Sequence, residues 1–302
     1  MAGLNDNTRG ALLMVISMLS FTTNDTLIKL ALRDLPLFQS IFIRGCCATL
    51  ILGLIAWRMG QLGSWPTGRD RTLMLARTLC EALGTWCFFT ALQHMPQATL
   101  TAIVQTAPLT ITLGAALVLN ERVGWRRINA ILIGFAGVLL IVRPGANAFG
   151  GYAIFALGAL ACVTVRDLCA RAMSPVLPSV LAALAVSAGL TVFAGVGSGV
   201  EGWQPVSAPP LLFIALAGLC IVSGFITAVS AMRVGEIGAV APFRYTSLVA
   251  ALILGLLVFG EWPDALTLVG AALIVASGLF TLYRGRKTGA AAVAQAAEPP
   301  QP

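Results

Sequence analysis

The stretch TTNDTLIKLALRDLP, residues 22–36, ends the first apolar segment of the chain and returns 142 positions later as TVRDLCARAMSPVLP. In both copies a carboxylate precedes a cation by four residues, first as Asp25 and Lys29 and then as Asp167 and Arg171. Side chains four residues apart lie on one face of a helix, and ionisable groups inside a membrane are costly unless they pair or face water. The repeat therefore predicts a duplicated chain that builds a pathway through a membrane.

The composition is that of a membrane protein. Hydrophobic residues make up 58% of the 302 positions, charged residues make up 10%, and the mean hydropathy is +0.90. An α-helix needs about 20 apolar residues to cross a bilayer, and the alternation expected of a β-barrel is absent. The sequence predicts an all-α polytopic protein with ten transmembrane helices, near residues 10–31, 36–57, 72–93, 96–119, 124–143, 150–172, 178–198, 209–232, 238–259 and 264–284.

The ten helices divide into two repeats of five. Because five is an odd number, the second repeat starts on the other side of the membrane, so the repeats are inverted. The later helices of each half agree at an offset of 140, which pairs Glu121 with Glu261. We expect a cytoplasmic N-terminus, a first repeat, a second repeat and a disordered cytoplasmic tail, at residues 1–9, 10–145, 146–284 and 285–302.

The distribution of lysine and arginine predicts the orientation. Twelve of these residues fall in segments on the side of the N-terminus, whereas Arg33 and Arg143 alone fall on the other side. Cytoplasmic segments are the ones enriched in lysine and arginine. We therefore expect both termini to be cytoplasmic and the protein to lie in the cytoplasmic (inner) membrane. The cations are scattered over helix ends, so the net charge of +7 does not favour nucleic acid as a partner.

Several motifs resemble one family. They are Asn24-Asp25-Thr26-Leu27-Ile28-Lys29, Arg44 in the second helix, and the run from Leu119 to Gly145 that includes Asn120-Glu121-Arg122 and Ile141-Val142-Arg143-Pro144-Gly145. Together with the ten-helix plan, they resemble the EamA-type branch of the drug/metabolite transporter superfamily. The resemblance implies transport of a small organic metabolite. The first helix is most similar to carriers for riboflavin or S-adenosylmethionine uptake, and the branch also includes exporters of amino acids.

Five polar side chains inside the expected helices are candidates for the substrate pathway: Arg44, Glu81, Gln105, Arg244 and Tyr245. An arginine in a membrane needs water or a partner, and Asp25 and Glu81 are the plausible carboxylates for Arg44. Gln105 and Tyr245 correspond at the offset of 140 and lie near Pro108 and Pro242. A proline frees a backbone carbonyl, which is tolerated where a cavity or neighbour satisfies it. The alternative is that these groups only link helices.

The repeated pairs Asp25/Lys29 and Asp167/Arg171 are candidates for gating or proton linkage. Since the repeats are inverted, the first pair should lie toward the outside and the second toward the cytoplasm. The alternative interpretation is a neutralised pair near each interface, because Lys29 and Arg171 are close enough to helix ends to extend to water.

Other classes of protein lack support in the sequence. The chain has one histidine and seven cysteines, without a C-x-x-C motif, so we expect no metal site and no cofactor. The motifs of a Walker A loop, a serine hydrolase or a zinc protease are absent, so we expect a secondary transporter working by alternating access rather than an enzyme or a channel. Small residues such as Gly134, Gly137 and Gly270 could serve contacts within the chain or a homodimer.

Overall fold

A computed structural model describes residues 5–63, 66–118, 124–143, 151–174 and 177–297. Helices are the only regular secondary structure in these ranges, which confirms the all-α prediction. The elements are α1 (Asp6–Ala31), α2 (Leu37–Arg58), α3 (Gly68–His94), α4 (Gln97–Val104), α5 (Ala107–Val118), α6 (Trp125–Val142), α7 (Ala153–Ala172), α8 (Ser179–Glu201), α9 (Ala208–Val234), α10 (Ile237–Val240), the 3₁₀ helix η1 (Ala241–Tyr245), α11 (Thr246–Phe259) and α12 (Ala265–Ala297).

These elements form the ten expected membrane spans. Within the described ranges, nine helical spans are long and apolar enough to cross a membrane. The tenth is α3, which has 27 residues but carries charges, among them Arg77 and Glu81, along its length. Arg77 and Glu81 also lie on the wall of an internal cavity, so α3 is polar where it faces that cavity.

Two of the spans are broken near their midpoints. The fourth span bends at Gln105 and Thr106, between α4 and α5. The ninth span passes through η1, which contains Pro242, before α11 begins. A proline lacks the backbone N–H that continues a helix, and the two breaks fall at matching positions of the repeats. Both prolines are visible in the sequence, but we had expected each of these spans to be one continuous helix.

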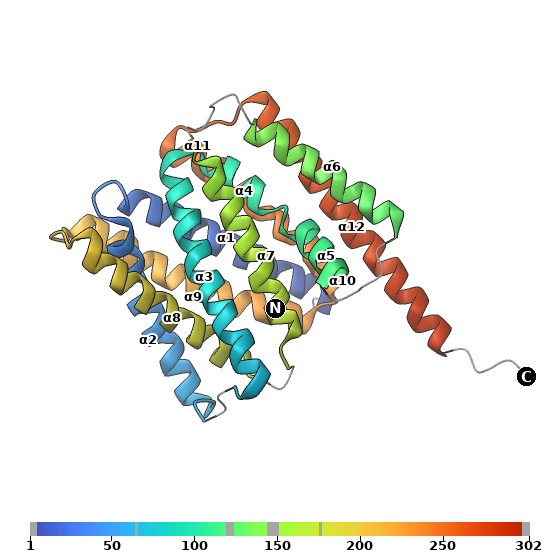
Figure 1. The fold of residues 1–302 in the computed structure, drawn as a ribbon, viewed down its shortest axis with the longest axis horizontal. Helices are drawn as coiled ribbons and strands as arrows, with labels where there is room; N and C mark the ends of the chain where they lie inside the picture. Colours follow the sequence, from blue (N-terminus) through green and yellow to red (C-terminus); the bar gives the residue numbers. More distant parts are fainter. Residues whose placement is uncertain (1–4, 64–65, 119–123, 144–150, 175–176, 298–302) are drawn as a thin grey trace, which may run out of the picture.

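Helix packing follows the symmetry of an inverted repeat. The most extensive contacts join α1 to α9, α3 to α7, α6 to α12 and α2 to α8. Exchanging the two halves converts the α1–α9 contact into the α7–α3 contact and leaves the other two unchanged. In Figure 1, α6 and α12 lie side by side along one edge of the bundle. The halves therefore contact each other throughout the molecule, and a space between them is shared by both.

The last helix is longer than expected. We predicted a disordered tail over residues 285–302, whereas α12 continues as a helix to Ala297. The segment after Gly289 is rich in alanine, the residue with the highest helix propensity, which explains the extension. Residues 298–302, like Glu121, lie outside the described residues.

Glycines allow α6 and α12 to approach closely. A Cβ added at Gly270 would lie 2.6 Å from the carbonyl oxygen of Gly137, and one at Gly137 would lie 2.7 Å from that of Gly270. We expect Gly270→Ala to lower the free energy of unfolding by about 1–3 kcal/mol, because the backbones must separate. The melting temperature of the detergent-purified protein measures this. The control is Gly199→Ala in α8, where a Cβ meets nothing within 4 Å; equal melting temperatures of the two variants would contradict the packing argument.

Candidate functional site

A cavity of about 450 Å³ lies between the two halves. Its lining comes from α1, α2, α3, α4, α5, α7, α8, α9, η1 and α11, and its volume is in the usual range for a site that binds a small molecule. The charged side chains on its wall are Asp25, Arg44, Arg77, Glu81, Arg166, Asp167 and Arg244. Of the nine predicted site residues, the structure places six on this wall: Asp25, Arg44, Glu81, Gln105, Asp167 and Arg244.

A buried polar cluster joins α1 to α2. The Arg44 guanidinium donates to Oδ1 of Asn24 at 3.2 Å, and Nδ2 of Asn24 donates to Oδ1 of Asp25 at 2.9 Å. The Arg44 guanidinium also lies 5.1 Å from the centre of the Phe89 ring, a distance suited to a cation–π contact. The Asn24 amide therefore links the cation to the carboxylate, so that Arg44 is neutralised without direct contact with Asp25.

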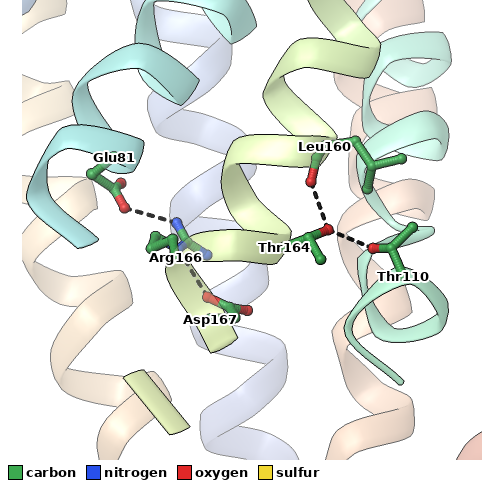
Figure 2. Close-up of polar contacts among 6 residues, drawn as sticks. All are labelled: Glu81, Thr110, Leu160, Thr164, Arg166 and Asp167. Carbon is green, nitrogen blue, oxygen red and sulfur yellow. Dashed lines mark hydrogen bonds and ion pairs between the residues drawn. The ribbon is translucent and has the colours of Figure 1, made fainter. Parts of the chain in front are cut away.

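A second cluster joins α3 to α7 (Figure 2). Nη1 of Arg166 donates to Oε2 of Glu81 at 2.9 Å, and Nε of Arg166 donates to Oδ1 of Asp167, also at 2.9 Å. All three side chains are less than one-third exposed. One arginine thus holds two carboxylates at the cavity wall and ties the first repeat to the second.

Sequence reasoning missed Arg166. At the offset of 142, Arg166 corresponds to Asn24, and both residues bridge the following aspartate to a charged group on another helix. The sequence did contain a signal, because a polar residue stands directly before each repeated aspartate: Asn24 before Asp25 and Arg166 before Asp167. For Asp167 we had considered only Arg171, four residues away on the same helix.

The expected pair of Asp25 and Lys29 is wrong. Nζ of Lys29 donates to Oε1 of Glu261 at 2.6 Å and to the carbonyl of Met95 at 3.0 Å. Oε2 of Glu261 accepts a hydrogen bond from the backbone N–H of Gln97 at 3.1 Å. Lys29 lies in the last turn of α1, so its long side chain reaches the end of the bundle, while Asp25 faces the cavity one turn earlier.

The expected pair of Asp167 and Arg171 is also wrong. Asp167 binds Arg166, its neighbour in sequence, whereas Arg171 is exposed at the end of α7. The guanidinium of Arg166 is already fixed beside the carboxylate by its bond to Glu81. Because the Asp167 carboxylate is already paired, the Arg171 guanidinium is stabilised more by contact with water at the helix end.

The broken helices meet at Gln105. Nε2 of Gln105 donates to the carbonyl oxygen of Arg244 at 2.7 Å and to the hydroxyl of Ser247. The side chain of Gln105 thus satisfies a backbone carbonyl in η1, where the helical hydrogen-bond pattern changes. Both the Gln105 and the Arg244 side chains line the cavity.

Tyr245 does not face the pathway, contrary to expectation. Its side chain is buried, at 7% exposure, and its hydroxyl lies where a Cβ would stand on Gly278 of α12. Successive side chains of a 3₁₀ helix are about 120° apart, so η1 turns Arg244 toward the cavity and Tyr245 toward α12.

One end of the bundle is closed by contacts between the halves. We call this the Lys29 end; it is the end at which α1 finishes and α2 begins. Besides the Lys29–Glu261 pair, the side chain of Gln39 exchanges two hydrogen bonds with the backbone of Gln204, at 2.8 and 2.9 Å. Arg143 also pairs with Asp264 at this end. Hydrogen bonds from Arg143 and Thr267 lower the pKa of Asp264 to about 2, so this pair stays ionised at neutral pH.

The cavity extends from below the Lys29 end toward the opposite end of the bundle. Its wall includes Thr101, one turn after Gln97, and reaches Met14 and Met232. Met14 precedes Lys29 by fifteen residues, which is about 22 Å along a helix. The cavity is therefore sealed at the Lys29 end and runs most of the way to the end at which α1 begins.

Comparisons with known proteins agree with this fold. Residues 8–143 match the EamA-like transporter family. The pseudopaline exporter CntI of Pseudomonas aeruginosa is 27% identical over 278 residues, which cover 88% of this chain and 93% of the relative. The S-adenosylmethionine uptake transporter of Rickettsia bellii is 26% identical over 276 residues, covering 90% and 93%. One crystal structure, 17% identical, has a TM-score of 0.65 over 90% of this chain and 96% of the other, which supports the fold alone.

The fold, the central cavity and these relatives define a class of protein, the multi-pass membrane transporters of small molecules. Within that class the chain is similar to the EamA-type transporters of the drug/metabolite transporter superfamily, whose family model matches its first repeat. The family resemblance inferred from the motifs around Asp25, Arg44 and Arg143 is thereby confirmed.

Proposed function

We propose that this protein is a secondary transporter that carries a small polar organic metabolite through the cavity between its halves by alternating access. The observation that carries the proposal is a cavity with seven charged side chains on its wall, sealed at one end by the Lys29–Glu261 pair. Buried charges in a membrane protein mark substrate and ion pathways, and inverted repeats allow the halves to rock about a central site.

The orientation follows the distribution of cations. With both termini in the cytoplasm of the cell and the protein in the cytoplasmic membrane, the Lys29 end faces outward. The cavity then belongs to a state that is closed to the outside. Lys29 and Glu261 form the outer gate, Asp25 and Asp167 serve gating or proton linkage, and Arg171 acts at the inner end.

The named relatives differ from each other in substrate and in direction of transport. S-adenosylmethionine, named for the Rickettsia relative, is a nucleoside-like compound, as expected from the first-helix resemblance. Uptake of riboflavin or a similar vitamin or nucleoside-like compound remains the leading proposal. Export of amino acids or related metabolites is the second candidate, and it is favoured by the Pseudomonas relative, which is an exporter.

Flux in proteoliposomes tests the proposal. The purified protein is reconstituted and supplied with labelled riboflavin, S-adenosylmethionine and amino acids, at several pH values and with a protonophore. We expect saturable flux of at least one compound, and a reduction of about tenfold or more in Arg44→Ala and Glu81→Gln. Arg233→Gln, exposed at the end of α9, is the control. Flux no greater than in empty liposomes for every compound, or normal flux in both cavity variants, would refute the proposal.

A further inference from the structure

The charges on the cavity wall do not balance. The wall carries four arginines and three carboxylates. Two of those carboxylates, Glu81 and Asp167, are bound by one arginine, Arg166. The third carboxylate, Asp25, is joined to Arg44 through the Asn24 amide. Among the described residues, this leaves two lining arginines, Arg77 and Arg244, without a hydrogen-bonded carboxylate.

Arg77 is the more exceptional of these two arginines. Its Nε is buried and has no hydrogen-bond partner in the described part of the chain. It lies on α3 one turn before Glu81, whose carboxylate is directed to Arg166 instead. An N–H donor that is buried without a partner is costly, and the planar fork of a guanidinium matches a carboxylate in two-point contact. An anion bound in the cavity would satisfy this group.

Another part of the wall is apolar. The lining from α8 and α9 includes Val186, Leu190, Ile221 and Phe225, and Phe225 packs edge-to-face on Phe21 with ring centres 5.4 Å apart. At the offset of 140, Ile221 is the counterpart of Glu81. The symmetry of the repeats is thus broken: α3 and α7 contribute four of the seven charged side chains on the wall, whereas α8 and α9 contribute none.

We infer that the cavity binds an organic anion whose carboxylate is held by the Arg77 guanidinium, with Arg244 adding positive charge, and whose apolar body packs on α8 and α9. The inference rests on the proposed transport function, because it names the substrate class of the same cavity. The carboxylate of the bound anion adds one negative charge to the four arginines and three carboxylates of the wall. The formal net charge of the wall and the ligand together is then zero. A neutral compound of the same shape leaves Arg77 unpaired and binds more weakly.

Ligand-dependent melting of the detergent-purified protein tests the inference without requiring transport. The probes are indole-3-acetate and N-acetyl-phenylalanine, each compared with its neutral amide. We expect the acids to raise the melting temperature at concentrations about tenfold lower than the amides. In Arg77→Gln the concentration required for the acids should rise about tenfold, and in Arg77→Lys about threefold, since lysine keeps the charge but loses the fork. Arg58→Gln, exposed at the end of α2, should match the wild type.

Three results would overturn the inference: no shift with either acid, equal shifts with acids and amides, or unchanged acid binding in Arg77→Gln. The melting temperature without ligand shows that each variant is folded. If the amides bind as well as the acids while proteoliposomes transport a neutral compound, the inference fails and the transport function stands. If the acids bind with the expected pattern but no compound is moved, the transport function fails and the anion site stands.

Discussion

Arg166→Gln should abolish transport and lower the stability of the protein. The variant leaves Glu81 and Asp167 as neighbouring carboxylates that have lost their shared cation at the cavity wall. Removing one partner from a buried ion network costs about 3–5 kcal/mol, and because these side chains are 18–25% exposed we expect the lower end of that range. Flux in proteoliposomes should fall by about a hundredfold, since both α3 and α7 lose the contact that shapes the site.

Two further variants test whether the effect of Arg166→Gln comes from the loss of the ion network. Arg166→Lys keeps the positive charge but can no longer bind both carboxylates through a rigid fork, so it should retain part of the flux and most of the stability. Glu81→Gln with Arg166→Gln removes one charge of each sign and should be more stable than Arg166→Gln alone. An Arg166→Gln protein with the flux and melting temperature of the wild type would contradict the role of the network.

Lys29→Gln should open the sealed end of the cavity. The Lys29–Glu261 pair is a charge-assisted hydrogen bond, with side chains 10% and 25% exposed, and such bonds contribute about 1.5–3 kcal/mol. A bias of that size changes the ratio of closed to open molecules by about tenfold or more. The reporter is Thr101→Cys in a protein whose seven native cysteines are replaced. Its labelling by a membrane-impermeant thiol reagent applied at the Lys29 end should increase about tenfold.

The neighbouring pair provides the control for Lys29→Gln. Arg143→Gln breaks the contact with Asp264 at the same end of the bundle, but Asp264 is 54% exposed there, and exposed pairs contribute about 0–1 kcal/mol. Labelling of Thr101→Cys should therefore change by less than about threefold. Equal effects of the two variants would show that the Lys29–Glu261 pair has no special part in closing this end.

The sequence was sufficient to predict the helices and the inverted repeat. Runs of apolar residues are long and local, so most span boundaries lie within a few residues of the expected ranges. The candidate site was predicted in part: Asp25, Arg44 and Glu81 lie on the cavity wall, because charge inside an apolar helix is itself a signal.

The partners of these charges could not be predicted in the same way. Lys29 binds Glu261 and Arg166 binds Glu81, and both contacts join residues from different halves that are distant in sequence. Pairing by helical spacing favoured neighbours on one helix, whereas the packing of α3 on α7 places a better partner nearby. Tyr245 was misplaced because the sequence did not reveal that η1 is a 3₁₀ helix.

The most direct test of the central claim, that the cavity between the halves is the transport pathway, is to block it chemically. A single cysteine is placed at Thr85, which lines the cavity on α3, in the cysteine-free protein. A transported compound identified by the flux panel is then measured before and after reaction with a bulky thiol reagent. A second single cysteine at Gly199, away from the cavity on α8, serves as the control. We expect modification at position 85 to reduce flux to the level of empty liposomes and excess substrate to slow the modification, whereas modification at position 199 should leave flux unchanged. Undiminished flux through the fully modified Thr85→Cys protein would contradict the claim that the cavity is the pathway.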